Sequence, residues 1–328
     1  MSRMGRGATL ALLLLLACST PATRVPGRLK VEPFLGADPA LHFIAADAKI
    51  LAVAIPQAGG RVVHYSLDGD NILYNPMKNG QPQPGGGYGL DLGPERTIPP
   101  HPALWTGKHA WAMLGDIVTI TSLRDPAVGL RVEKNLMIDG ATGALDILQR
   151  MKNGSDGERA WCFWDRTLCR AGGFGIIPLN PKSRFPAKWV LGTRRGPLWW
   201  EYNGTNPSHP GVKVLDGVLV TKAEGPEQKV GADSDAGWIA YIRGSLLFVK
   251  YFPYVPDGDY VDNGLSVAHY FNDTIAELEP LSPEARLKPE GEFTFPEHWT
   301  LSRLSHEVTT HEEARAVAAT IPRSPFAP

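Results

Sequence analysis

Two glutamates, Glu277 and Glu279, form an unusual acidic pair inside a strand-like run near the C-terminal end of the sequence. Acidic residues are uncommon in strands. Because strand side chains alternate between faces, both carboxylates and Ile275 point to the same side. The pattern therefore predicts an acidic face that either meets solvent or lines a polar concavity.

A lysine, Lys250, interrupts the apolar run 245–252 on the same face as Phe248 and Phe252. A lysine there costs free energy unless its ammonium group reaches a partner or water. Two interpretations stay open: the side chain leaves the sheet at an edge, or it reaches a polar pocket. In the second case the acidic strand offers a charge partner from another strand.

A glycine-rich segment, residues 81–102, brings several polar side chains close together in the sequence. Asp91, Glu95 and Arg96 lie at its centre, and His101 follows near its end. Its glycines would let the backbone approach a ligand closely. The alternative is an ordinary surface loop.

Aromatic residues gather in two places, residues 161–166 and 198–202. The first run contains Trp161 and Trp164, which point to opposite faces if the run is one strand, and it leads into Asp165. Aromatic rings beside charged groups suit a sugar site, because a pyranose stacks its C–H face on a ring while its hydroxyls bond to the charged groups. The alternative is packing in the core.

The composition indicates a globular, turn-rich all-β protein. Of the 328 residues, 43% are hydrophobic and 20% are charged, which is enough for a full core. Glycine (35) and proline (29) are abundant, and the apolar runs are short and rich in β-branched or aromatic residues. A net charge of −1 gives no electrostatic basis for binding nucleic acid.

Strand patterns recur along the chain, with one helical segment at its end. A turn at residues 68–71 predicts a hairpin between 59–67 and 72–74. Residues 311–320 predict a short helix or a frayed tail. The other strand-like runs are 50–55, 116–122, 130–138, 144–151, 238–242, 245–252 and 292–301.

The N-terminus resembles a bacterial lipoprotein signal. Arg3 and Arg6 precede an apolar run at residues 8–17 that is too short to span a bilayer, and the run ends at Ala17 and Cys18. The resemblance implies that Cys18 becomes the lipidated N-terminus, and Ser19 after it favours an outer-membrane anchor facing the periplasm. The alternative is an ordinary signal peptide with an incidental cysteine.

These features divide the chain into a signal peptide (1–17), a lipidated cysteine with a Pro/Ser/Thr-rich tether (18–30), one β-domain (31–305) and a C-terminal tail (306–328). The sequence leaves open whether Cys162 and Cys169 form a disulfide, which would need a turn between them. The oxygen-rich loop 257–264 either is a solvated turn or holds calcium, although its spacing does not fit an EF-hand. We expect no metal, no cofactor, no transmembrane helix after Cys18 and no nucleic-acid partner.

Short motifs spread over residues 45–303 match a known pattern in their order and spacing: 59–61, 69–73, 89–95, Asn153, Trp164, Asp165, Gly237, Trp238, Lys250, 277–279, 287–291 and Trp299. Through them the sequence resembles the galactose-mutarotase-like (aldose 1-epimerase-like) superfamily, and most closely a family of unknown function within it. The resemblance implies a large antiparallel β-supersandwich whose concave sheet binds a carbohydrate.

The resemblance also implies roles for individual residues. Glu277 falls where the mutarotases carry the base that removes the anomeric proton, but the position of their histidine acid, after Asn153, offers no histidine. Asp165 or His101 would then act as the acid, with His109 and His269 as further candidates. The implied sugar ligands are Arg61, Asp91, Glu95, Arg96, Trp164, Lys250 and Glu279.

Three functions follow as hypotheses. The missing histidine puts a carbohydrate-binding envelope lipoprotein without standard mutarotase activity first. An aldose 1-epimerase-like enzyme with Glu277 as general base comes second. A structural envelope protein is the third.

Overall fold

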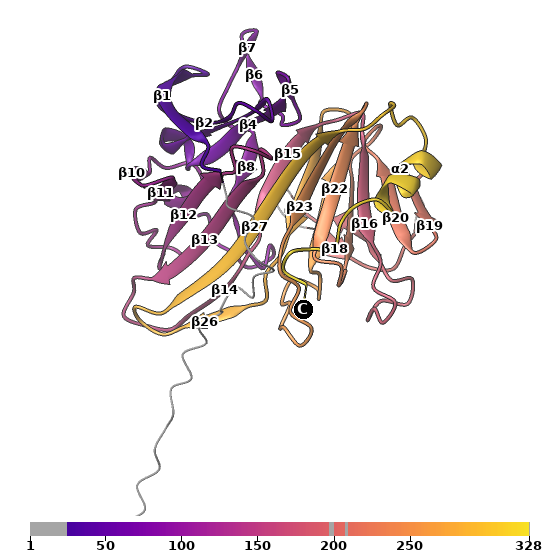
Figure 1. Ribbon diagram of the computed structural model, residues 1–328. Coiled ribbons are helices and arrows are strands. Elements are labelled where there is room, and N and C mark those ends of the chain that lie inside the picture. Colours follow the sequence, from indigo (N-terminus) through magenta and orange to yellow (C-terminus); the bar gives the residue numbers. More distant parts are fainter. Residues whose placement is uncertain (1–24, 197–199, 207–208, 328) are drawn as a thin grey trace, which may run out of the picture.

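Two large antiparallel sheets dominate the computed structural model, which describes residues 25–196, 200–206 and 209–327 (Figure 1). In the described residues the first sheet has 12 strands and the second has 10. The first runs in the order β1 (Arg28–Phe34), β2 (Ala37–Ala45), β3 (Ile50–Ile55), β4 (Arg61–Leu67), β8 (Gly87–Gly89), β15 (Arg166–Arg170), β25 (Ile275–Pro280), β24 (Val267–Phe271), β21 (Gln228–Ala232), β17 (Val190–Arg194) and β18 (Trp200–Tyr202), with β5 (Asp70–Asn71) paired to β4.

The second sheet lies against the first and contains the longest strand, β27. Its order is β10 (Ala110–Leu114), β11 (Ile117–Thr121), β12 (Leu130–Ile138), β13 (Leu145–Asn153), β27 (Glu292–Arg303), β23 (Leu246–Tyr251), β22 (Trp238–Arg243), β16 (Phe174–Pro178), β20 (Val218–Lys222) and β19 (Val212–Leu215). Smaller elements are the sheet β26 (Ala285–Leu287), β14 (Arg159–Phe163) and β9 (Leu92–Gly93), the hairpin β6 (Met77–Lys78) and β7 (Gln81–Pro82), a 3-10 turn η1 (Pro56–Ala58), and helices α1 (Pro102–Trp105) and α2 (His311–Ala318).

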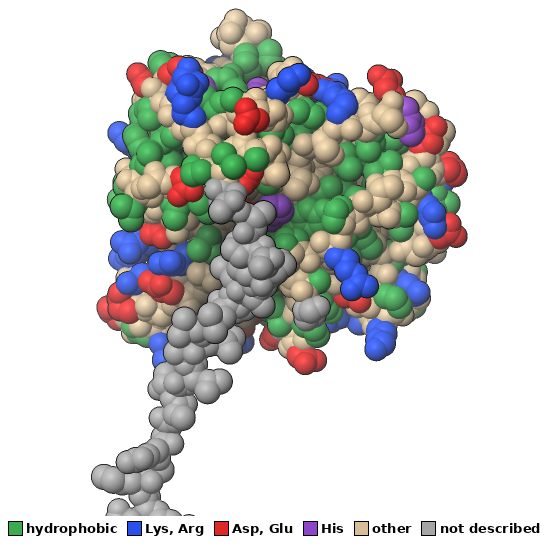
Figure 2. All heavy atoms as spheres, viewed as in Figure 1, with side chains coloured by type: hydrophobic (Ala, Val, Ile, Leu, Met, Phe, Trp, Pro, Cys, Tyr) green, Lys and Arg blue, Asp and Glu red, His purple; other side chains and the backbone are tan. Residues whose placement is uncertain are grey.

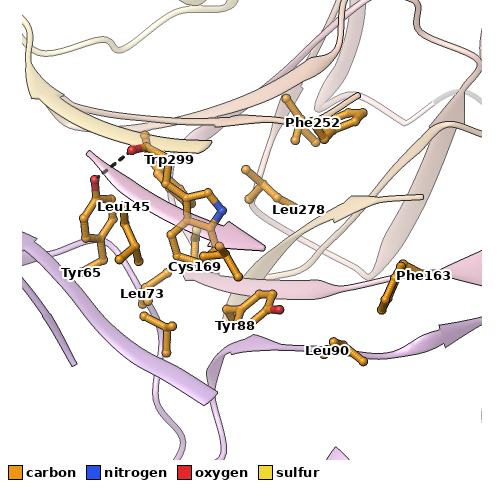
Figure 3. Close-up of a cluster of buried hydrophobic side chains, with 14 of the residues drawn as sticks. Tyr65, Leu73, Tyr88, Leu90, Leu145, Phe163, Cys169, Phe252, Leu278 and Trp299 are labelled. Carbon is orange, nitrogen blue, oxygen red and sulfur yellow. Dashed lines mark hydrogen bonds between the residues drawn. The ribbon is translucent and has the colours of Figure 1, made fainter. Parts of the chain in front are cut away.

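A shared hydrophobic core joins the two sheets. It combines inward-facing residues of the first sheet, such as Leu278, with residues of the second, such as Leu145 and Trp299 (Figure 3). The Tyr65 hydroxyl donates to the backbone oxygen of Trp299 at 3.3 Å, so a polar contact also crosses between the sheets. The antiparallel all-β architecture expected from the sequence is confirmed.

The strands with the clearest alternation lie where the sequence predicts them. In β12 and β13 the core face is buried at every second residue, as in a sheet with one face on the core. The run 161–166 differs, because it is not one strand. β14 ends at Phe163 in the small sheet, and β15 begins at Arg166 in the 12-stranded sheet. The intervening Trp164 and Asp165 therefore leave the regular alternation.

Both ends of the predicted β-domain extend further than expected. β1 begins at Arg28, inside the predicted tether. At the other end, Thr310 and Glu313 form a capping box that starts α2, and Val317 of this helix is buried against the second sheet. Residues 311–318 are therefore a packed helix rather than a frayed tail.

Charged side chains of both signs are mixed around the periphery of the face drawn in Figure 2, so neither sign forms a continuous patch on it. No helix within the described ranges is long and apolar enough to cross a membrane.

Candidate functional site

A cleft of about 550 Å³ opens on the outer face of the 12-stranded sheet. Its floor comes from β15, β25, β24, β21, β17 and β18, which are neighbours in that order, and the segment 91–106 forms a wall. The lining residues from the floor are Arg166, Ile275, Glu277, Tyr270, Lys229, Arg194 and Trp200; those from the wall are Asp91, Glu95, Ile98, Pro99, Pro100, His101, Pro102, Trp105 and Thr106.

Strand register builds the centre of the floor. Glu277 is opposite Tyr270, and Tyr270 is opposite Lys229, so the three side chains stand in one row across β25, β24 and β21. The next residue in the row is Gly192, where an added Cβ would lie 3.2 Å from the Lys229 Cβ. The glycine thus leaves space beside the lysine.

Lys229 is the cation that pairs with Glu279 of the acidic strand. Its side chain is almost fully buried, with Nζ 2.9 Å from Glu279 Oε2 and 3.3 Å from Glu95 Oε1. The Trp164 indole also donates to Glu279 Oε2 at 2.7 Å, and Lys229 Nζ lies 4.4 Å from the Trp164 ring centroid. Burial favours the neutral form of Glu279, but the charges of Lys229 and Arg166, with the hydrogen bonds from Lys229 and Trp164, together outweigh burial and hold the pKa of Glu279 below its usual value.

A second chain of charges crosses the wall of the cleft. Arg166 Nε lies 3.0 Å from Asp91 Oδ2, and His101 Nε2 lies 2.7 Å from Asp91 Oδ1. The other ring nitrogen of His101 faces the Pro99 carbonyl at 2.8 Å. Burial lowers the pKa of His101, but the hydrogen bond and charge of Asp91 raise it by more. Both ring nitrogens of His101 face acceptors, an arrangement that favours the protonated ring because it can donate from both nitrogens.

Glu277 is the lining carboxylate with the strongest tendency to hold a proton. Burial, followed by the negative charge of Glu279, raises its pKa to about 7, although Arg166 and Lys229 oppose the shift. Its neighbour Glu279 stays ionised through Lys229, so the pair has one charged and one readily protonated carboxyl group. A carboxylate with a pKa near 7 is suited to act as a base at neutral pH.

This shift predicts a pH-dependent effect of Glu277→Gln. Between the usual pKa of 4.5 and about 7, the folded protein binds more protons than the unfolded chain, so wild-type stability falls as pH rises through this window. The glutamine side chain does not ionise, so the variant should be more stable than wild type at pH 8 by on the order of 1–3 kcal/mol, with a smaller difference at pH 5. Thermal unfolding at the two pH values measures this. Glu158→Gln, at an exposed position, is the control, and an equal change at both pH values would contradict the assignment.

Aromatic rings border the polar floor. Trp105 and Trp200 line the cleft together with Tyr270. Arg61 lies over the Trp105 ring at 4.1 Å, and Arg194 lies over the Trp200 ring at 4.8 Å, so each indole is braced by a guanidinium group. The cleft therefore places the half-buried ring of Trp105 and the largely buried ring of Trp200, which is 8% exposed, beside charged hydrogen-bonding groups.

Six of the seven residues predicted as sugar ligands divide into three groups, and the seventh, Lys250, lies elsewhere. Asp91 and Glu95 line the cleft. Arg61, Trp164 and Glu279 are buried around it and hold its lining residues through the contacts above. Arg96 is exposed and is not among the lining residues.

Lys250 and Asp165 lie in the core instead of the cleft. Both side chains are fully buried, and Lys250 Nζ forms an ion pair with Asp165, lies 3.3 Å from Glu297 Oε2 and donates to Thr167 Oγ1 at 2.8 Å. Lys250 therefore reaches charged partners inside the protein, but these are Asp165 and Glu297 and not the glutamates of the acidic strand. The charge partner of Glu279 is Lys229, because Lys250 belongs to the other sheet.

Among the histidines named as candidate acids, His101 lines the cleft and the other two do not. His269 is fully buried, with Nδ1 2.7 Å from the Glu277 carbonyl oxygen, and burial lowers its pKa to about 4. His109 is buried with Nε2 3.2 Å from the Ala103 carbonyl oxygen, and burial lowers its pKa to about 3.

Cys162 and Cys169 are both free and buried. Within the described residues, no group of three or more His, Cys, Asp or Glu side chains could hold a metal ion, and this includes the loop 257–264. Cys18, Leu198 and Trp199 lie outside the described residues.

Sequence reasoning missed Lys229, Tyr270 and Trp105 as site residues. The sequence holds only a partial signal for Lys229: small or apolar residues follow it in the run 228–232, but polar Gln228 precedes it. Nothing in the sequence pairs it with Glu279, which is 50 positions away in number (279 − 229) and two strands away in the sheet.

No family model matches the sequence, and no curated protein matches it. Solved structures do resemble it. A galactose mutarotase-like protein from Clostridium acetobutylicum has a TM-score of 0.59 at 11% identity, covering 85% of this chain and 99% of its own. A protein of Escherichia coli K12 assigned as an aldose 1-epimerase has 0.57 at 10% identity (81% and 100%). A galactose mutarotase-like protein from Lactobacillus casei has 0.56 at 8% identity (80% and 100%). The chain thus has the galactose mutarotase-like fold.

Proposed function

We propose that the cleft binds a carbohydrate. The observation that carries this proposal is the combination in one cleft of a polar row, Glu277 and Lys229 on either side of Tyr270, with the indoles of Trp105 and Trp200. Carboxylates and cations bond to the hydroxyls of a sugar, and an indole accepts the C–H face of a pyranose. The fold alone does not establish such a function, so the argument depends on these side chains.

Trp105→Ala tests this proposal. The Trp105 ring is half-buried and lines the cleft, so its removal should weaken sugar binding by about 1–2 kcal/mol, a roughly five- to thirtyfold rise in Kd. A glycan-array screen identifies the ligand, and titration of tryptophan fluorescence measures its Kd, both in a detergent without a sugar headgroup. Trp111→Ala, in the edge strand β10, is the matched control and should bind as wild type does. If no glycan binds, the structural role in the envelope gains support instead.

A second candidate is aldose 1-epimerase activity, which one observation favours. Glu277 lines the cleft and its pKa is raised to about 7, as a base for the anomeric hydroxyl proton requires. His101 lines the same cleft, but its two ring nitrogens are already bonded to Asp91 and Pro99. Because ring opening needs a proton donor aimed at the sugar, binding without turnover stays first.

An anomerisation assay separates the two candidates. The purified protein is mixed with freshly dissolved α or β anomers of the sugar that it binds, and NMR follows their equilibration. Acceleration that Glu277→Gln abolishes supports the enzyme. Binding of the sugar with an unchanged equilibration rate supports the binding protein.

The proposed setting is the bacterial cell envelope, with the protein held by lipid on Cys18 and facing the periplasm from the outer membrane. The support is the signal-like segment that ends at Ala17 and Cys18. Several acyl chains on one cysteine hold a protein on a membrane stably, where a single chain would not.

A further inference from the structure

Among the described residues, an apolar edge strand without a pairing partner forms one side of the 10-stranded sheet. β10 is its terminal strand and carries no charged residue, reading Ala-Trp-Ala-Met-Leu, and all five residues are exposed. Leu114 is 84% exposed and Met113 is 54% exposed, and Trp111 and Ile117 are also exposed. Edge strands usually carry charges that prevent association. This hairpin, β10 to β11, carries none on β10.

The chain leading from Cys18 reaches the sheet at the tip of this hairpin. The Gly27 N–H donates to the Ile138 carbonyl oxygen at 3.2 Å, at the end of β12. β11 pairs antiparallel with β12, with Val118 opposite Leu136, so the start of β11 lies at that same end. Accordingly, Pro26 and Gly27 line one pocket with Met113, Gly115 and Asp116 of the hairpin, which Figure 1 draws beside β12.

The length of this connection limits the distance between lipid and hairpin. Val25 is seven residue steps from Cys18 along the chain (25 − 18), and an extended chain spans at most about 3.3–3.6 Å per step. A lipid on Cys18 therefore holds Val25 within about 25 Å of the bilayer surface, whatever path the connection takes. The end of the domain that carries the hairpin is the end that faces the lipid.

We infer that the β10–β11 hairpin contacts the bilayer, with Trp111, Met113 and Leu114 at the lipid surface. The inference rests on the proposed lipid anchor at Cys18 and adds to it a second membrane contact, made by the folded domain. A tryptophan beside exposed aliphatic side chains suits the membrane interface, where the indole keeps its N–H in a polar layer. Two contacts would also fix the orientation of the cleft relative to the membrane.

The test uses the full chain, processed in a bacterium that lipidates such signals and reconstituted in phosphatidylethanolamine–phosphatidylglycerol vesicles. Leu114→Cys is labelled with the environment-sensitive dye NBD, and lipids with spin-labelled acyl chains serve as quenchers. Val214→Cys is the matched control, because Val214 is an exposed aliphatic residue on β19, the opposite edge strand of the same sheet. Cys162 and Cys169 are buried, and the labelled wild-type chain gives their background.

The expected result is a loss of most NBD fluorescence at position 114 with almost none at position 214. Equal or absent quenching at both positions, in protein that sediments with the vesicles, would overturn the hairpin contact and leave the lipid anchor standing. If mass spectrometry of the processed protein shows no acyl chains on Cys18, the proposed lipid anchor is wrong, and this inference is wrong with it. Sedimentation of the detergent-solubilised protein as a dimer that Leu114→Glu dissociates would assign the edge to a second copy of the chain instead.

Discussion

Lys229→Met is expected to cost about 3–5 kcal/mol of unfolding free energy and to abolish sugar binding. The ammonium group of Lys229 is the cation closest to Glu279 and also contacts Glu95, and all three side chains are buried. Without it, Glu279 loses its ion-pair partner in a buried site, and Glu95 keeps only the more distant contact of Arg166 at 3.5 Å among the ion pairs of the described residues. Removing one partner of a buried ion pair leaves an uncompensated charge. Chemical denaturation measures the stability loss, and fluorescence titration measures the loss of affinity.

The double variant Lys229→Met with Glu279→Gln provides the control. Because it removes a positive and a negative charge together, it should recover part of the lost stability. Sugar binding should stay lost, since Lys229 lines the cleft. Wild-type affinity in the folded single variant would contradict the role given to this lysine.

Lys250→Met is expected to lower stability by a similar amount, about 3–5 kcal/mol, without changing the sugar affinity of the folded protein. Lys250 is the cation between Asp165 and Glu297, which are fully buried between the sheets and outside the cleft lining. Burial, with the charge of Glu297, raises the pKa of Asp165 well above its usual value even with the lysine present. A carboxyl group whose pKa is raised in the folded state takes up a proton there and so stabilises that state at low pH. The loss of unfolding free energy in Lys250→Met should therefore be smaller at pH 5 than at pH 8.

The matched variant for Lys250 is the triple change Lys250→Met, Asp165→Asn and Glu297→Gln. It removes all three charges and should be more stable than the single variant. Two results would contradict the view that this lysine neutralises the core carboxyl groups: a loss of unfolding free energy in Lys250→Met that does not depend on pH, or a Lys250→Met variant that is as stable as wild type. A loss of sugar affinity in the folded single variant would contradict its separation from the cleft.

Local patterns in the sequence predict the strands because alternation is a property of each strand alone. Residues 50–55 and 130–138 form strands with the predicted bounds, and the all-β class follows from many such runs. The run 161–166 fails because the chain changes from one sheet to another at Trp164 and Asp165. Sheet membership depends on distant partners, and the sequence of a run does not contain it.

The candidate site likewise has one part that local patterns in the sequence predict and one part that depends on strand order. Alternation places Glu277 and Glu279 on one face, and the loop segment brings Asp91, Glu95 and His101 to the wall beside it. The lysine that pairs with Glu279 on this face could not be identified from the sequence. Lys250 interrupts an apolar strand, whereas Lys229 lies in a short strand of mixed character that reads Gln-Lys-Val-Gly-Ala. Only the strand order puts Lys229 two strands from the acidic pair and Lys250 in the opposite sheet.

Saturation-transfer difference NMR of the purified protein with a panel of sugars and short glycans tests whether the cleft binds a carbohydrate. We expect transfer to the ring C–H protons on one face of a sugar, because an indole in the cleft accepts that face, and a much weaker transfer in Trp105→Ala. Absence of transfer to every member of the panel, or equal transfer in wild type and Trp105→Ala, would contradict carbohydrate binding by the cleft.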